Sequence, residues 1–192
     1  QFSQMAVECA IKNNKLFIYG EATTKAKINY KRIARKILKD IGYKNSFRIS
    51  VEISKQSPDI SQAVLKDVVC ANDQGMVYGY ATNETEEYMP LTIVIAHLLM
   101  KNYEEFRKTN DNFFADAKCQ VSVEYNHNKP VNITTILISV SHSENLNKNE
   151  IELDIMKNVI NKTLVKFKAF TTKTKFIINP SGKFTVWGSF GD

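Results

Sequence analysis

"CQVSVEYNHNKPVNITTILISVS", residues 119–141, alternates apolar and polar positions on both sides of the polar segment "NHNKP". Alternation with a period of two is typical of β-strands that bury one face, and polar residues with Pro between two such runs favour a turn. Residues 148–164 follow as an amphipathic helix, and strand-like residues 174–180 and 183–189 come after it. The stretch therefore predicts a hairpin, then a helix, then a further strand. The apolar side of that helix is expected to consist of Ile151, Ile155, Val159 and Ile160.

The same order of elements occurs earlier in the chain. The elements expected there are strands at 5–12 and 15–23, a helix at 29–41 and a strand at 47–54. Asn13 and Asn14 suit a tight hairpin turn, Asn29 suits a helix N-cap, and Gly42 follows the expected helix end. Between the two rounds lie strand-like residues 75–81 and a helical pattern at 87–108. The prediction is an α+β fold of repeated subdomains, each a mixed or antiparallel sheet with helices packed on one face.

The helix predicted at 29–41 combines apolar residues at helical spacing with many basic ones. Ile28, Ile33, Ile37, Leu38 and Ile41 are expected to form its buried side, with Lys and Arg on the solvated side. This interpretation explains the main basic cluster without a nucleic-acid partner. A basic nucleic-acid-binding module stays open on the net charge of +6 alone.

Composition narrows the class of protein further. A chain of 192 residues that is 43% hydrophobic can bury a substantial core, and no apolar run reaches the roughly 20 residues that span a bilayer. The three cysteines are far apart and odd in number, which favours reduced thiols and a cytoplasmic location. The sequence begins at Gln1 without a leader and stops soon after a strand-like run, so both ends are expected to be cut.

Five polar stretches are candidates for a site: Glu21 near a strand end, "QSPDI" at 56–60, Asp73 before a glycine, Asp116 with Lys118, and "NPSGKF" at 179–184. Taken singly, each is also explained by turn formation, which favours Asn, Asp, Gly and Pro. The sequence contains neither of the two common glycine-rich nucleotide loops and no G-x-S-x-G motif.

The order of these stretches resembles S-adenosylmethionine synthetase (methionine adenosyltransferase). The resemblance runs from about Glu8 to Asp192 through "GEATTKAKINY", "KQSPDISQAV", "NDQGMVYGYATNETEEYMPLTIVIAH", "DAKCQVSVEY", "INPSGKF" and "GSFGD". It implies three similar α+β subdomains and an enzyme that transfers the adenosyl group of ATP to the sulfur of L-methionine and releases phosphate and diphosphate. It also implies magnesium and potassium as cofactors, and homodimers or homotetramers with active sites between subunits, without nucleic acid or membrane as partners.

The resemblance divides the chain into an N-terminal subdomain at 1–68, with a gating loop at about 56–66, and a central subdomain at 69–192. The C-terminal subdomain is expected to be absent from this chain, as are the segment with the magnesium aspartate and a catalytic histidine before Gln1. These 192 residues alone are therefore expected to be inactive. A truncated relative that only binds nucleotide or pairs with subunits remains the alternative.

The resemblance also assigns roles by motif position. The methionine-binding residues it implies are Glu21, Gln56, Asp73 and Asp192. The ATP-binding residues it implies are Asp116, Ala117, Lys118, Ser181, Gly182, Lys183, Phe184 and Asp192. Lys118 and Asp73 take catalytic roles, and Glu8 is associated with potassium. Lys183 replaces the family's usual arginine, and "ANDQG" replaces its usual "GAGDQG".

The chemistry explains these residue types. The leaving triphosphate needs cations where its charge accumulates, and the ammonium group of methionine needs carboxylate or amide acceptors. Glu84, Glu86 and Glu87 are instead expected in a turn and at a helix N-terminus, where acidic groups oppose the helix dipole.

Overall fold

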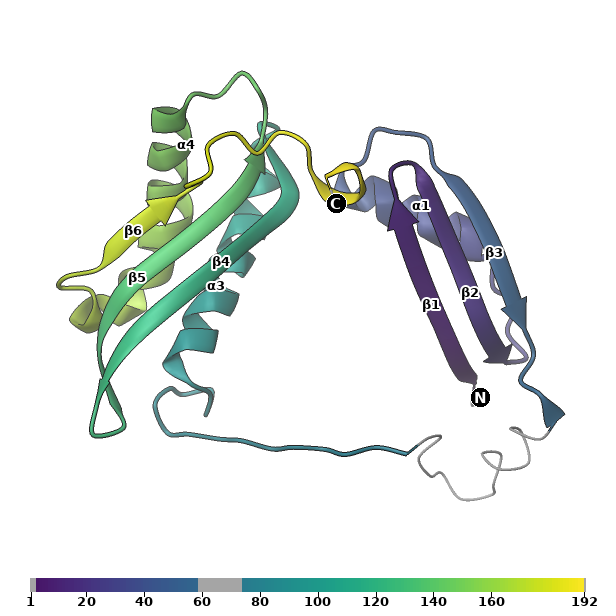
Figure 1. Cartoon of the computed structure of the whole chain (residues 1–192), viewed down its shortest axis with the longest axis horizontal. Coiled ribbons are helices and arrows are strands. Elements are labelled where there is room, and N and C mark those ends of the chain that lie inside the picture. Colours follow the sequence, from purple (N-terminus) through teal and green to yellow (C-terminus); the bar gives the residue numbers. More distant parts are fainter. Residues whose placement is uncertain (1–2, 59–73, 192) are drawn as a thin grey trace. The chain divides into compact units, whose positions relative to one another are not determined.

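The computed structural model describes residues 3–58 and 74–191 and divides the chain into two compact units. The first unit is Gln1–Tyr78 together with Ser189–Asp192, and the second is Gly79–Gly188. Each unit holds one three-stranded sheet with helices against it (Figure 1). None of the helices in the described ranges is long and apolar enough to cross a membrane.

The first unit consists of β1 (Gln4–Lys12), β2 (Lys15–Thr23), α1 (Tyr30–Ile41) and β3 (Arg48–Ser54). β1 and β2 form an antiparallel hairpin whose turn residue Asn13 has a φ of 51°. β3 then pairs in parallel with β2, so β2 lies at the centre of the sheet. A parallel neighbour requires a crossover connection, and α1 provides it.

The ends of α1 are as predicted. The side chain of Asn29 accepts a hydrogen bond from the backbone N–H of Arg32 at 3.0 Å, and Gly42 ends the helix with a φ of 112°. The left-handed conformation at Gly42 costs glycine little because it has no Cβ. The two caps fix the helix between the hairpin and β3.

The predicted buried side of α1 is wrong in part. Ala34 and Leu38 pack against the sheet, but Ile33 and Ile37 are 47% and 52% exposed. Each residue turns an α-helix by about 100°, so side chains one position before the packed pair lie to its side. A helix with a broad apolar arc can bury only the part that meets the sheet.

The second unit repeats the plan of the first with one more helix before it. Its elements are α3 (Leu91–Arg107), β4 (Phe113–Asn126), β5 (Lys129–His142), α4 (Lys148–Ile155), a π-helical turn (Met156–Ile160), α5 (Asn161–Leu164), a 3-10 segment (Val165–Phe170) and β6 (Lys175–Ile178). β4 and β5 form the predicted hairpin, and His127 and Asn128 at its turn have φ values of 46° and 60°. β6 pairs in parallel with β5, which is therefore the central strand.

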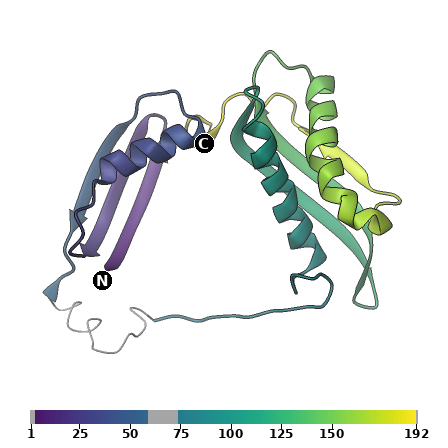
Figure 2. The same cartoon turned by 180° about the vertical axis from the view of Figure 1, so that it is seen from behind.

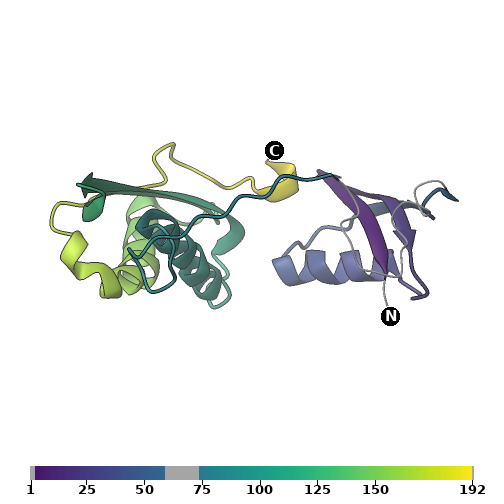
Figure 3. The same cartoon turned by 90° about the horizontal axis from the view of Figure 1, so that it is seen from below.

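The core of the second unit lies between its sheet and its helices. Ile151, Ile155, Val159 and Ile160 are all buried, as the helical spacing predicts, and pack with Ile138 of β5. Viewed from behind and from below, the helices of each unit lie against one face of its own sheet (Figures 2 and 3). The predicted α+β architecture of repeated sheets with helices on one face is confirmed.

Two predicted strands are not formed. Residues 74–80 have no regular structure, and Val77 and Tyr78 there are 95% and 88% exposed. Residues 183–187 are also irregular and lead into a 3-10 turn at Gly188–Phe190. Apolar residues give a strand only where a sheet edge supplies successive hydrogen-bonding partners. Neither segment forms a ladder with a described strand, although the Phe184 carbonyl accepts one backbone hydrogen bond from His142 of β5. The helix predicted from 87 begins at Leu91, after Pro90.

The last described residues belong to the first unit. The Ser189 N–H donates to the hydroxyl of Tyr43 at 2.9 Å, and the Ser189 hydroxyl donates to the carbonyl of Asn13 at 2.8 Å. The ring of Phe190 lies 6.3 Å from that of Tyr43 and 6.2 Å from that of Phe47. These contacts hold the C-terminal segment against the β1–β2 turn.

Truncation of Ile155 to Ala should destabilise the second unit by about 2–5 kcal/mol, because Ile155 is fully buried and the surrounding core closes a cavity only in part. Leu153→Ala is the control: Leu153 lies on the same helix and is 71% exposed, so its truncation should change stability by less than about 0.5 kcal/mol. Urea unfolding followed by the fluorescence of Trp187, the single tryptophan, checks both. Equal losses from the two variants would contradict the packing described.

Candidate functional site

The sheet of the first unit has one face packed against α1 and one face away from it. Leu16, Ile18 and Ala22 of β2 are buried, and Leu16 and Ile18 pack against α1. Side chains alternate along a strand, so Glu21 lies on the opposite face, with Phe17 and Tyr19. Phe17 and Tyr19 stack there with ring centroids 4.9 Å apart. We call the face of each sheet that points away from its helices the open face.

Glu21 and Gln56 come to the same end of this sheet. Glu21 is paired in register with Ser54, near the end of β3, and Gln56 follows two residues later. The hydroxyl of Thr23 donates to the side-chain oxygen of Gln56 at 3.3 Å, which fixes Gln56 beside the end of β2. A carboxylate and an amide oxygen in this arrangement offer acceptors that suit an ammonium group.

The other predicted residues of this unit are placed in part. Glu8 is exposed on β1 and is paired in register with Tyr19, so it also lies on the open face. Asp73, Asp192 and residues 59–66 of the predicted gating loop lie outside the described residues.

In the second unit, Asp116 and Lys118 of β4 lie on the open face. Ala117, Cys119 and Val121 pack against the helix-covered core, and alternation turns their neighbours the other way. Lys118 is exposed and is paired in register with Ser139. One carboxylate oxygen of Asp116 accepts a hydrogen bond from the Gly188 N–H at 2.9 Å. The carbonyl of Asp116 accepts another from the Ser141 hydroxyl at 2.8 Å.

The turn at 179–184 is joined to β5 through Asn179. Its side-chain amide donates to the carbonyl of Val140 at 3.0 Å, and its side-chain oxygen accepts from the Val140 N–H at 2.8 Å. The side chain thus replaces one residue of strand pairing after β6 has ended. The Gly182 N–H donates to the Asn179 carbonyl at 3.0 Å and closes the turn.

His142 holds the other end of the same turn. The backbone N–H of His142 donates to the carbonyl of Phe184 at 2.9 Å, and the ring Nε2 of His142 accepts from the backbone N–H of Phe184 at 3.2 Å. The ring proton is therefore on Nδ1, which lies 2.9 Å from the carbonyl of Ser143. His142 is only 1% exposed, so this arrangement sits inside the unit. Sequence reasoning missed this role, because neither the alternation nor the Asn-Pro turn signal shows which strand a side chain contacts.

The two stretches predicted to bind ATP lie near the same end of the second sheet, but the structure does not bring their lysines together. β4 starts where β5 ends, since Phe113 is paired with His142 and Ala117 with Val140. Phe184 is bonded to His142 at that end, while Ser181, Gly182 and Lys183 are exposed in the turn. Lys118 lies on the open face, whereas Lys183 lines a cavity beside α4. No described contact joins the two lysines.

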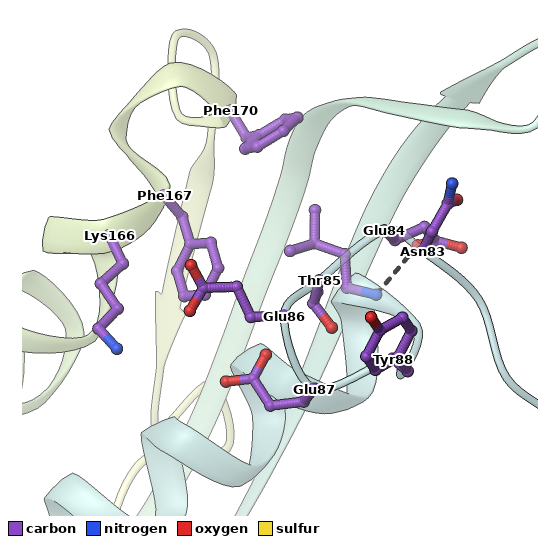
Figure 4. A pocket seen from close by; sticks show the side chains of 10 residues that line it. Asn83, Glu84, Thr85, Glu86, Glu87, Tyr88, Lys166, Phe167 and Phe170 are labelled. Carbon is purple, nitrogen blue, oxygen red and sulfur yellow. Dashed lines mark hydrogen bonds between the residues drawn. The ribbon is translucent and has the colours of Figure 1, made fainter.

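The acidic segment before α3 forms one wall of a larger cavity of about 760 Å³ (Figure 4). Lys166, Phe167 and Phe170 form the facing wall, and the carboxylates of Glu86 and Glu87 turn toward the side where Lys166 and Phe167 lie. Three glutamates against one lysine would repel a triphosphate. This cavity is therefore a poor candidate for the ATP site.

Glu84, the first of those glutamates, has a structural role. Its carboxylate accepts hydrogen bonds from the Leu91 N–H at 3.0 Å and from the Tyr125 hydroxyl at 2.7 Å. It thereby caps α3, where Pro90 at the N-cap position supplies no side-chain hydrogen bond. The Leu91 N–H first, and then the Tyr125 hydroxyl, lower the pKa of Glu84, while burial and the bond to Glu84 raise the pKa of Tyr125 to about 12.

Comparison with protein-family models gives two matches in consecutive order. Residues 1–66 match the model for "S-adenosylmethionine synthetase, N-terminal domain", and residues 68–184 match "S-adenosylmethionine synthetase, central domain". The chain belongs to the S-adenosylmethionine synthetase family. The resemblance predicted from the sequence motifs is confirmed, and Glu21 and Gln56 lie in the match to the N-terminal domain.

Synthetases of this family use divalent and monovalent cations. Mg²⁺ and K⁺ both require oxygen ligands, Mg²⁺ in octahedral geometry. Residues 3–58 and 74–191 contain no group of three His, Cys, Asp or Glu side chains that could hold a metal ion. Glu8 supplies one exposed carboxylate on β1, which is too few ligands for a cation on its own. The described residues alone therefore do not form a site for either ion.

Replacing Glu84 with Ala should cost about 0.5–2 kcal/mol of stability, because the first turn of α3 loses its capping acceptor. The pKa of Glu84 is lower in the folded protein than in the unfolded chain. The stabilisation is therefore complete above the unfolded pKa and is lost as the pH falls through the folded pKa. Denaturant unfolding between pH 7 and 3 should show a smaller acid-induced loss in Glu84→Ala than in the parent. Glu86→Ala, an exposed neighbour, serves as control; an identical pH profile in Glu84→Ala and the parent would contradict the capping role.

Proposed function

We propose that this protein acts as a methionine adenosyltransferase, which transfers the adenosyl group of ATP to the sulfur of L-methionine and releases phosphate and diphosphate. The observation that carries the proposal is the match of two consecutive synthetase domains over residues 1–66 and 68–184. The thioether is a neutral nucleophile, so rate enhancement depends on orienting sulfur against the ribose carbon and on stabilising the leaving triphosphate.

For methionine, we propose Glu21 and Gln56 as acceptors for the ammonium group, with Asp73 and Asp192 completing the site. Support comes from the Thr23–Gln56 hydrogen bond and from the register of Glu21 with Ser54, which bring both groups to one end of the first sheet. Part-buried Glu21 keeps a carboxylate near a strand end, where a bound cation would be only partly screened by water. Residues 56–66 are proposed to gate this site.

For ATP, we propose that Asp116, Ala117 and Lys118 bind together with residues 181–184 and Asp192. Support comes from the hydrogen bonds of His142 to Phe184, which hold the turn at the end of the sheet where β4 begins. Lys118 is proposed as the catalytic cation on the polyphosphate, and Asp73 as the catalytic carboxylate. Lys183 keeps the positive charge of the usual arginine but not its planar pair of donors.

The proposal includes a homodimer or homotetramer with active sites between subunits. Support comes from the open face of the first sheet, where the large side chains Phe17 and Tyr19 are 37% and 39% exposed beside Glu21. Exposed aromatic residues next to site residues are typical of surfaces that pair. Magnesium and potassium are the proposed cofactors, with Glu8 near potassium. The free thiols of Cys9 and Cys119 support a reducing, cytoplasmic location.

The direct test incubates the protein, expressed from its complete coding sequence, with ATP, L-methionine, Mg²⁺ and K⁺. We expect S-adenosylmethionine, phosphate and diphosphate in equal amounts, and no product when methionine is omitted. Binding of ATP without any product would refute the enzymatic proposal and favour a non-catalytic relative.

Glu21→Ala should raise the KM for methionine by about 10- to 100-fold, the effect of losing one hydrogen bond to a charged group, with a much smaller change in the KM for ATP. Asp40→Ala, which removes the same charge from the exposed side of α1, should leave both constants near their original values. Steady-state kinetics with each substrate varied in turn measures this. A methionine KM that stays unchanged in Glu21→Ala removes this residue from the site.

Lys118→Ala should slow the chemical step by roughly 30- to 1000-fold, because the charge on the leaving triphosphate grows in the transition state. Lys183→Ala should have a smaller effect, and Lys183→Arg should be close to neutral. Lys129→Ala at the exposed start of β5 is the control for loss of charge. Single-turnover kinetics separates this step from product release; normal rates in both Ala variants at 118 and 183 would reject the polyphosphate assignment.

A further inference from the structure

A small cavity of about 220 Å³ lies in the second unit, next to the turn at 179–184. The end of β5, the start of α4 and the turn itself supply its walls. The residues that line it are His142, Leu146, Asn147, Lys148, Ile151, Glu152, Ile178, Asn179, Gly182 and Lys183. It lies on the helix-covered side of the sheet, since Ile151 and Ile178 belong to the core. Gly182 and Lys183 also belong to the proposed ATP site, whereas nothing assigns a ligand to the space between Leu146, Ile151 and Ile178.

The polar groups on the inner wall are already satisfied. The amide of Asn179 exchanges two hydrogen bonds with the backbone of Val140, and both ring nitrogens of His142 have backbone partners. A ligand could bond to these groups only by breaking contacts that hold the turn. Leu146, Ile151 and Ile178 supply the remaining inner surface. The interior therefore suits an apolar body and offers little to a polar one.

The mouth of the cavity is positively charged. Lys148 lies 3.7 Å from Glu152 in an exposed ion pair, with side chains 74% and 42% exposed. Such pairs contribute little in water, so Lys148 can turn to another anion. Lys183 is exposed in the turn and adds a second positive charge. Two lysines and one glutamate leave a net charge of one positive unit at the rim.

We propose that this cavity is a binding site for a small apolar anion, one or two fused rings that carry a carboxylate. The ring system would fill the space between Leu146, Ile151 and Ile178, and the carboxylate would meet Lys148 and Lys183 at the mouth. A dry cavity of about 150 Å³ accepts benzene, so the volume here has room for a somewhat larger ring system. Mostly apolar lining with a few placed polar groups is the general character of small-molecule sites.

A ligand bound in the cavity would also affect the turn at 179–184. Gly182 and Lys183 line the cavity, and a built Cβ on Gly182 meets no other atom within 4 Å, so the turn has open space beside it. A ligand that fills the cavity would restrict the turn between its two attachments, Asn179 and His142. An effect of the ligand on ATP binding would require the ATP site of the proposed function, because coupling needs two binding sites. The binding itself does not depend on that function.

The experiment titrates the full-length protein with 2-naphthoate, without ATP or methionine, by calorimetry and by the amide NMR signals of Gly182 and Phe184. We expect saturable binding of one molecule per chain, shifts of both amides, and slower hydrogen exchange at Phe184. Leu146→Phe, which fills the cavity, should weaken binding by 10-fold or more. Lys183→Gln should weaken it by about 2- to 5-fold, as should replacement of the probe by neutral 2-naphthamide. Lys129→Gln, an exposed lysine on the hairpin, is the control and should bind normally.

Several outcomes would overturn the proposal. These are the absence of saturable binding at millimolar naphthoate, shifts confined to other amides, and undiminished binding in a folded Leu146→Phe protein. Equal affinity for naphthoate and naphthamide would exclude an anion as the preferred ligand. If Leu146→Phe does not fold, Lys183→Gln and the amide shifts decide. Because no readout uses catalysis, failure of the proposed enzymatic activity would leave these results untouched.

Discussion

In each unit the helices cover one face of a three-stranded sheet, and this packing organises the rest of the described structure. A three-stranded sheet has no second layer of its own, so its apolar side chains must pack against the helix that connects the hairpin to the third strand. In the first unit, α1 performs this task with Ala34 and Leu38. In the second, α3, α4 and the helical turns that follow cover a larger core. The opposite faces carry the proposed site residues Glu21, Asp116 and Lys118.

Strand alternation then places packing residues and proposed site residues at neighbouring positions. Ala117 and Cys119 point into the core. Asp116, which precedes Ala117, and Lys118, which lies between the two core residues, point to the open face. The pKa of the Cys119 thiol is raised by burial, which suits an inert packing residue rather than a nucleophile. On β2, likewise, Glu21 points to the open face while its neighbour Ala22 is buried. A substitution at one of these open-face positions can therefore alter binding with limited effect on packing.

The distribution of charge follows the same division. The chain is basic overall, yet an acidic segment precedes α3. In that segment Glu84 caps the N-terminus of α3, because its carboxylate accepts hydrogen bonds from the Leu91 N–H and the Tyr125 hydroxyl. The lysines proposed to bind the polyphosphate lie elsewhere, Lys118 on β4 and Lys183 in the turn after β6. The turn is held in place by hydrogen bonds to the Val140 backbone and to the backbone and ring of His142.

The sequence by itself determined the elements that depend on local periodicity and caps. The hairpins, the helix from Asn29 to Gly42, and the buried side of the helix at 148–164 follow from side-chain spacing and turn chemistry. The motif order was sufficient to indicate the family. Only the tertiary structure decided that Ile33 and Ile37 stay exposed, that 75–81 forms no strand, and that His142 and Asn179 hold the turn. The physical reason is that periodicity shows which residues can share a face, whereas burial and hydrogen bonding depend on partners distant in the chain.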